Sequence, residues 1–320
     1  MNRRNTILGI VLIAQLVLVI FLYNSGSSEH KSEITLTDFE PENIISLTIS
    51  DSYGSSTKLQ KQDGKWLIDP PENYPADKER VKSALKKLAN LKSERLVSSS
   101  KGSHGRLRVG KENFNRLISL EDSGGNKYQI FLGTTQGRGV YARKGGSDDV
   151  VFVNKLSSWE FATSPRSWWK TSMVDFTTDA VNRLELKNSK GIISIARDSN
   201  GRWVDKSGAT LDQDKVKKFL LAIKNIRLSE YLGKNTSSKL DKAEATLKIS
   251  LEKGKEITIE IGPEENSQRL VRASNIAHLL KVRSSELKKI LEARADDFKS
   301  APHVSEDAHS SQAGNATEKR

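Results

Sequence analysis

One stretch of this sequence has the residue types and spacing to bind an anion. Residues 101–111, KGSHGRLRVGK, form its densest basic segment. Arg106, Arg108 and Lys111 could bind phosphate or an acidic polymer through charge-assisted hydrogen bonds. We expect a loop between a helix and a strand here. A solvated basic loop without a ligand is the alternative reading.

A second candidate is aromatic. Residues 159–170, WEFATSPRSWWK, hold three of the five tryptophans, namely Trp159, Trp168 and Trp169. The cluster could be a binding surface, but large amphipathic rings more often fill cores or pack domains together. We expect these rings to pack two modules together, and keep them as candidate contact residues.

The other polar residues do not form a catalytic pattern. The five histidines are scattered without metal-ligand spacing, so no metal site is predicted. Residues 133–139, GTTQGRG, lack the order of a phosphate-binding loop and predict a hairpin loop. No GxSxG, Ser-Lys or Ser-His-Asp arrangement stands out. We predict no catalytic residue, no cofactor and no enzyme activity.

Composition removes further classes of site and leaves several partners open. The chain has no cysteine, which excludes disulfides, thiolate metal sites and thiol nucleophiles. A net charge of +12 is spread along the chain and favours anionic surroundings, whether nucleic acid, lipid headgroups or acidic wall polymers. Nucleic acid is not expected as a partner, because no recognised binding module is seen.

The first residues predict a membrane anchor. Residues 7–23 contain only one clearly polar side chain, Gln15, and follow Arg3 and Arg4. Such a helix rises about 25 Å, close to the roughly 30 Å of a hydrocarbon core. The positive-inside bias makes this a single-pass protein of the inner (cytoplasmic) membrane, with the bulk of the chain periplasmic. A signal peptide cleaved near Ser25-x-Ser27 is the alternative.

The sequence also repeats itself, which determines the expected architecture. DGKW at residues 63–66 and NGRW at residues 200–203 place tryptophans 137 residues apart, and an offset of 135 carries Asp77 onto Asp212. Each Asp precedes an apolar stripe at helical spacing. We expect an α+β fold of two tandem homologous modules, each a mostly antiparallel sheet with one or two helices, after one N-terminal transmembrane helix.

The expected domain boundaries follow from this repeat. The cytoplasmic tip, anchor and linker occupy residues 1–28, the first module 29–160, the junction and second module 161–298, and a disordered polar tail 299–320. The first module reads as β-β-α-β-β-β-β, and the second repeats that order. Helices are expected from Asp77 to about Lys92, from Asp212 through Ile226, and from Ser284 to about Phe298.

This pattern resembles a bacterial family catalogued as DUF4340, a domain of unknown function often found beside gliding-type ABC transporter genes. The resemblance rests on G-[KR]-W at residues 64–66 and 201–203, the Asp-led helices, strands ending in Leu132-Gly133 or Ile261-Gly262, and the segment 168–170. It covers about residues 40–296. Family members commonly have a Tyr-Gly-Leu-like turn and a Pro where this chain has residues 103–106, SHGR, so no binding role is carried over to that loop.

The resemblance implies a membrane-anchored extracytoplasmic protein that assists an ABC-type export or surface system, with the permease or other envelope proteins as partners. The leading hypothesis is thus a non-enzymatic scaffold or accessory subunit. A binding protein for acidic envelope polymer or lipid, using the basic loops, is the second hypothesis. An unrecognised hydrolase is the third.

Overall fold

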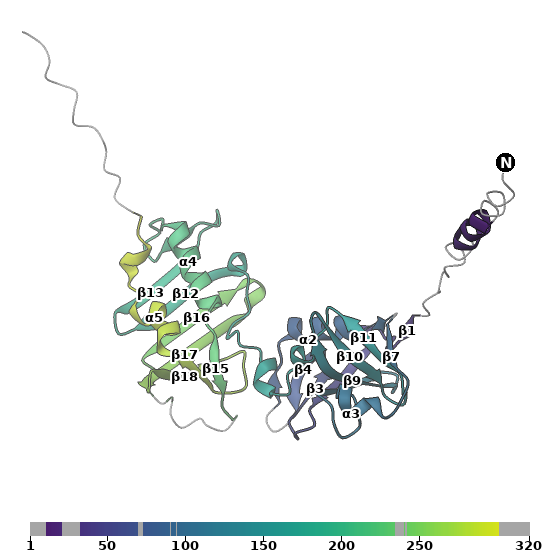
Figure 1. The fold of residues 1–320 in the computed structure, drawn as a ribbon. Helices are drawn as coiled ribbons and strands as arrows, with labels where there is room; N and C mark the ends of the chain where they lie inside the picture. Colours follow the sequence, from purple (N-terminus) through teal and green to yellow (C-terminus); the bar gives the residue numbers. More distant parts are fainter. Residues whose placement is uncertain are drawn as a thin grey trace, which may run out of the picture. The chain divides into compact units, whose positions relative to one another are not determined.

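The protein consists of two compact α+β units, each with a mostly antiparallel sheet and few helices (Figure 1). The structure is a computed structural model, and it describes residues 11–20, 33–69, 73–89, 91–93, 95–233, 240 and 242–300. The first unit ends at Lys170 and the second begins at Thr171. The α+β class with antiparallel sheets is therefore confirmed.

Nine of the strands described in the first unit form one sheet, in the order β5-β4-β3-β2-β8-β9-β10-β11-β7. Their bounds are β2 Ile44–Ser50, β3 Ser56–Gln62, β4 Lys65–Asp69, β5 Tyr74–Pro75, β7 Leu96–Ser98, β8 Arg116–Asp122, β9 Lys127–Gln136, β10 Gly139–Lys144 and β11 Val150–Asn154. A separate pair, β1 (Ile34–Thr35) with β6 (Lys92–Ser93), joins the start of the unit to the segment after its main helix.

That helix, α2 (Lys78–Leu88), begins where the sequence predicts and ends earlier. The Asp77 carboxylate accepts from the backbone N–H of Glu79 at 3.0 Å and of Arg80 at 3.1 Å. The expected continuation to about Lys92 is wrong, because the chain beyond Leu88 pairs with the first strand. The Leu36 N–H donates to the Leu91 carbonyl at 2.8 Å, which draws this segment away from the helix axis.

The first sheet carries apolar side chains on both faces over β9 to β11. Ile130 and Leu132 belong to the large core that α2 covers, whereas Phe131 belongs to a smaller cluster with Leu107 and Val109. Neighbouring residues of a strand point to opposite faces, so these two clusters lie on opposite sides of β9. The second face is covered by α3 (Ser103–Leu107), a short helix where we expected a loop.

Eight strands form the sheet in the described part of the second unit, in the order β14-β13-β12-β16-β17-β18-β19-β15. They are β12 Val181–Asn188, β13 Gly191–Arg197, β14 Trp203–Asp205, β15 Leu228–Tyr231, β16 Ala245–Leu251, β17 Glu256–Glu265, β18 Gln268–Ala273 and β19 Leu280–Arg283. Two helices, α4 (Gln213–Lys224) and α5 (Ser284–Glu292), lie over this sheet (Figure 1). Exposed Lys187, Lys248 and Arg272 alternate with buried apolar residues along the strands, so the face away from the helices is polar.

The last helix is shorter than expected. Instead of continuing from Ser284 to about Phe298, α5 ends at Glu292 and a 3₁₀ turn follows at Ala295–Phe298. The Asn188 side-chain amide donates to the carbonyls of Ile290 at 2.8 Å and Ala293 at 3.0 Å. Satisfying these terminal carbonyls from another element ends the helix there.

The expected anchor and tail lie largely outside the described residues. Of residues 7–23 only 11–20 are described, and they are helical with exposed apolar side chains. No helix within the described residues is long and apolar enough to cross a membrane. Of the tail expected at 299–320, the structure describes residues 299 and 300.

The two cap carboxylates give a first prediction. Asp77→Ala or Asp212→Ala leaves two N–H groups of a helix start without an acceptor, so each change should lower the free energy of unfolding by about 1 kcal/mol. Urea unfolding followed by far-UV circular dichroism measures this. Asp214→Ala is the control, since it removes an acid from the same first turn and keeps the cap. An Asp212→Ala variant as stable as this control would contradict the assignment.

Candidate functional site

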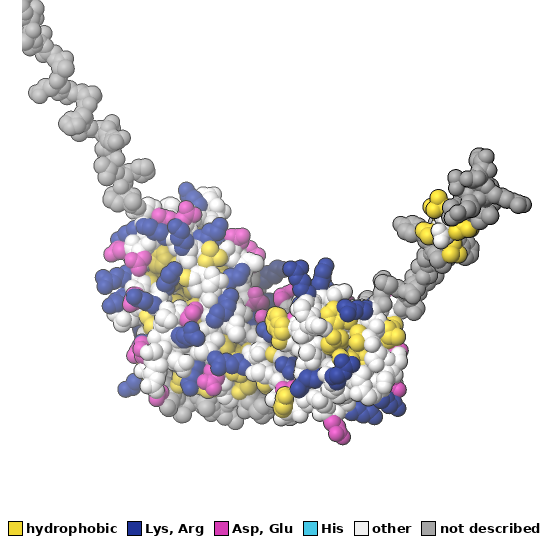
Figure 2. Space-filling model, viewed as in Figure 1, with side chains coloured by type: hydrophobic (Ala, Val, Ile, Leu, Met, Phe, Trp, Pro, Cys, Tyr) yellow, Lys and Arg dark blue, Asp and Glu magenta, His cyan; other side chains and the backbone are white. Residues whose placement is uncertain are grey.

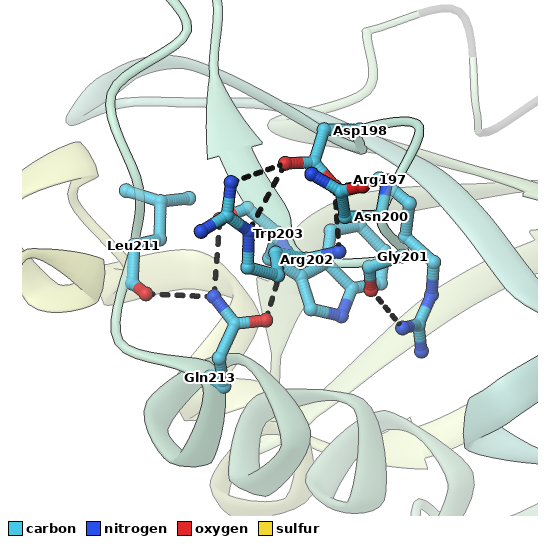
Figure 3. A network of polar contacts seen from close by, with 8 residues as sticks. All are labelled: Arg197, Asp198, Asn200, Gly201, Arg202, Trp203, Leu211 and Gln213. Atoms are coloured by element: carbon cyan, nitrogen blue, oxygen red, sulfur yellow. Dashed lines mark hydrogen bonds and ion pairs between the residues drawn. The ribbon is translucent and has the colours of Figure 1, made fainter.

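The G-[KR]-W motif of the second unit lies in a closed polar network (Figure 3). The Asp198 carboxylate accepts from the backbone N–H of Asn200 at 2.9 Å and of Arg202 at 2.8 Å. The guanidinium of Arg202 also donates to it, at 3.1 Å from Nη2. The Asp198 carboxylate is therefore used to fix the turn itself.

Trp203 is fixed through both its ring and its backbone. The Arg197 guanidinium lies 5.0 Å from the centre of the Trp203 ring and donates to the Gly201 carbonyl at 2.6 Å. The Gln213 amide accepts from the Trp203 N–H at 2.8 Å and donates to the carbonyls of Trp203 and Leu211 (Figure 3). The motif thus joins the β13–β14 turn to the start of α4, which is a structural role.

The Asp198 carboxyl gives a pH-dependent prediction. The hydrogen bond from the Arg202 backbone N–H is the main cause that lowers the pKa of the Asp198 carboxyl below its usual 3.8. The Arg202 guanidinium lowers this pKa further. A lowered folded-state pKa stabilises the fold above the unfolded-state pKa, and that contribution is lost as pH falls through the folded value. Asp198→Asn should lower the melting temperature at pH 7 and have a shrinking effect below about pH 4. Thermal unfolding of both proteins over this range measures it, and an equal deficit at pH 7 and pH 3 would contradict it.

The predicted basic cluster is only partly available for a ligand. Arg106 and Lys111 are exposed, on and after α3. Arg108 ends the helix in a left-handed conformation with φ 56°, and its Nη2 donates to the Tyr53 hydroxyl at 3.0 Å. This guanidinium also lies 5.7 Å from the centre of the Tyr53 ring, so Tyr53 already occupies it. The three cations are close in sequence, but Arg106 and Lys111 are exposed, whereas Arg108 is half-buried and bonded to Tyr53.

A buried arginine supports this helix, and sequence analysis missed it. Arg143 on β10 is only 3% exposed, and its guanidinium lies 4.2 Å from the centre of the Phe131 ring. It donates to the carbonyls of Val109 at 2.7 Å and Ser147 at 2.9 Å. Burial lowers the pKa of the guanidinium, and the nearby Asp148 carboxylate acts in the opposite direction. Arg143 therefore fixes the segment after α3 onto the sheet.

The three candidate tryptophans have different environments. Trp168, in the 3₁₀ turn Pro165–Trp168, is fully buried in the core of the first unit, and its indole N–H donates to the Ala162 carbonyl at 2.8 Å. Trp169 packs edge-on against Tyr74 in the same unit, with ring centres 5.7 Å apart. Trp159 is 73% exposed. The expectation that these rings pack two modules together is wrong for Trp168, whose ring fills the first unit's own core.

An open pocket of about 720 Å³ lies beside α5 in the second unit. It is lined by Ser189, Lys190, Glu244, Glu264, Arg269, Ser284, Ser285, Lys288, Leu291 and Glu292. Arg269 pairs with Glu244 and Glu264, and the ammonium group of Lys288 lies 3.9 Å from the Glu292 carboxylate, so each of the three carboxylates already has a cationic partner. Sequence analysis missed this pocket because its walls come from several separate segments. Within the described residues, no group of three or more His, Asp or Glu side chains could hold a metal ion.

Comparison with known families identifies the family of this chain. The model of the domain of unknown function DUF4340 matches residues 66–248, more than half of the chain. The match includes Trp66 and Trp203 and the helix caps Asp77 and Asp212. No curated protein and no solved structure gives a significant match. The resemblance inferred from the sequence is confirmed, and the chain belongs to the DUF4340 family.

Proposed function

We propose that this chain is a membrane-anchored, extracytoplasmic, non-enzymatic scaffold or accessory subunit of an ABC-type transport or surface-export complex. One observation carries the proposal: the repeated motif residues are used to build turns, helix caps and cores. Asp198 and Gln213 fix the G-[KR]-W turn, and Asp77 and Asp212 start helices. A fold that uses its repeated residues structurally is suited to presenting surfaces to partners.

We also propose that the two units are homologous modules. Apart from the short edge strand β5, which has no counterpart among the described strands of the second unit, the order β4-β3-β2-β8-β9-β10-β11-β7 corresponds to β14-β13-β12-β16-β17-β18-β19-β15. In each unit the last helical element among the described residues is a 3₁₀ turn that bonds to the helix cap. The Asp77 N–H donates to the Trp168 carbonyl at 2.7 Å, and the Asp212 N–H donates to the Phe298 carbonyl at 2.8 Å. These parallels support an internal duplication that includes the closing turn.

Co-purification tests the transporter assignment. The full chain with a C-terminal affinity tag is extracted in mild detergent after crosslinking in cells, and its partners are identified by mass spectrometry. We expect permease and ATPase subunits of one transporter. A chain that begins at residue 29 is the matched control, because it keeps both units and loses the anchor expected within residues 1–28. Recovery of no membrane partner by the full chain would overturn the proposal.

A second candidate, binding of acidic envelope polymer, is favoured by the exposure of Arg106 and Lys111 beside α3. Retention on an immobilised polyanion should weaken with salt and fall in the double variant Arg106→Ala, Lys111→Ala. The control removes two exposed cations from the second unit, by Lys187→Ala and Lys248→Ala. Equal losses in the two double variants would indicate general charge attraction and contradict a site at α3.

A further inference from the structure

The solvent side of α2 carries a row of lysines. Lys78, Lys82 and Lys86 follow one another at four-residue steps, and all three side chains are exposed. Residues four apart lie above one another on a helix, so their ammonium groups form one line. We call these three residues the lysine stripe. The helix KERVKSALKKL holds five cations and one anion, so its charge is strongly positive.

The other charged groups around α2 already have partners. Arg80 lies 5.1 Å from the centre of the Trp168 ring, and Lys87 pairs with Glu160. After the helix, Lys92 pairs with Glu33 at 3.0 Å. Glu79 is the only acid within the helix, next to the first lysine of the stripe. Lys and Arg side chains are spread over the face of both units that Figure 2 shows, but the regular spacing of the stripe along one helix gives it a linear shape.

Hydrogen bonds tie this helix to the first described residues of the unit, which follow the expected anchor in the sequence. The buried residues Leu36 and Thr37 bind the segment that follows α2: the Thr37 hydroxyl accepts from the Leu91 N–H at 3.1 Å and donates to the Leu88 carbonyl. The C-terminal end of α2 is therefore fixed to the first residues of the unit. Only residues 24–32, nine positions rich in Ser, separate Glu33 from the expected end of the anchor.

Such a short linker limits how far the unit can move from the bilayer. Nine residues reach at most about 30 Å, even when they are fully extended. That upper limit is only about twice the radius of gyration of a compact unit of this size. A tethered surface also needs little intrinsic affinity, because the linker raises its effective concentration at the membrane.

We propose that the lysine stripe binds the headgroups of anionic phospholipids and holds the first unit against the membrane that the anchor enters. This inference rests on the anchor in the proposed function. Ammonium groups are compact point charges suited to phosphate oxygens, and juxtamembrane lysines are attracted to anionic lipid surfaces. The stripe thus gives the first unit a preferred orientation at the bilayer.

Fluorescence energy transfer tests the inference on the full chain. The chain has no cysteine, so Ser83→Cys, an exposed position on α2, gives a single labelling site beside the stripe. The labelled protein is reconstituted into phosphatidylcholine vesicles with or without phosphatidylglycerol, each containing a headgroup acceptor dye. We expect transfer to increase severalfold with phosphatidylglycerol and to fall back in high salt. The triple variant Lys78→Gln, Lys82→Gln, Lys86→Gln should lose this increase and keep its helix, because Gln and Lys have similar helix propensities.

A matched control removes the same charge from the other unit. Lys217→Gln, Lys218→Gln and Lys224→Gln neutralise three cations of α4, and this variant should keep the full increase. Equal loss in the two triple variants, or no increase for the wild-type sequence, would overturn the inference. Capture of the labelled chain by a soluble polyanion in preference to the vesicles would also overturn the lipid assignment. Flotation with neutral vesicles in high salt reports on the anchor alone, so failure of the proposed function is seen separately.

Discussion

Replacing Gly133 by alanine should lower the free energy of unfolding of the first unit by about 3 kcal/mol or more. A Cβ atom at this position would lie 2.0 Å from the Leu107 carbonyl oxygen and 3.0 Å from that of Arg108. Both obstacles are backbone atoms, so no change of side-chain rotamer can relieve the clash. The segment after α3 would have to move off β9, and the Asn115 bond to the Gly133 carbonyl, at 2.7 Å, would be strained with it.

Urea unfolding followed by far-UV circular dichroism measures this effect, and Gly262→Ala is the matched control. Gly262 follows Ile261 in the second unit as Gly133 follows Leu132 in the first, but a Cβ atom at Gly262 would lie 3.1 Å from the Leu240 side chain and 3.3 Å from the Leu270 carbonyl oxygen. Gly262→Ala should therefore lower the free energy of unfolding by less than about 1 kcal/mol. If the two variants were equally stable, the close packing of α3 on β9 would be wrong.

Trp168→Ala should lower the free energy of unfolding by about 3–5 kcal/mol, because it leaves a large cavity in the core of the first unit. The change also removes the stacking partner of Arg80 and the indole bond to the Ala162 carbonyl. Trp168→Phe should have an intermediate effect, because it keeps an aromatic ring in the core but loses part of the indole volume and the hydrogen bond, the latter worth about 1 kcal/mol.

The comparison for Trp168 is Trp159→Ala, in the same segment of the sequence. Trp159 is 73% exposed, so its replacement should change the free energy of unfolding by no more than about 0.5 kcal/mol. Chemical denaturation monitored in the far ultraviolet measures all three variants without relying on tryptophan fluorescence. A larger loss for Trp159→Ala than for Trp168→Ala would show that the two environments have been assigned the wrong way round.

Local patterns predicted the parts of the fold that local interactions determine. Asp77 and Asp212 were recognised as helix starts, because a cap needs only an acceptor beside the first turn. The ends of the same helices were placed less well. α2 ends at Leu88, whose carbonyl accepts a hydrogen bond from the Thr37 hydroxyl. Thr37 lies 51 residues earlier in the chain, so no local pattern reports that contact.

The candidate site was predicted less completely, for a related reason. The α3 helix has five residues, below the length at which periodicity is informative, and it depends on tertiary packing for its stability. Arg143 looks like an ordinary strand residue in the sequence. It is buried only because the loop at Val109, 34 residues away, supplies an acceptor for its guanidinium. The edge strands β7 and β15 were missed because they are short and paired on one side only.

The closing turns have a consequence for the order in which the chain becomes stable during synthesis. Asp77 finds the Trp168 carbonyl 91 residues later, and Asp212 finds the Phe298 carbonyl 86 residues later. Neither unit is complete until its final turn has been made. Contacts so distant in sequence form late, and an unfinished sheet remains open to chaperones and proteases meanwhile. A nascent chain arrested between residues 171 and 298 should therefore carry one finished unit and one that is still a substrate for degradation.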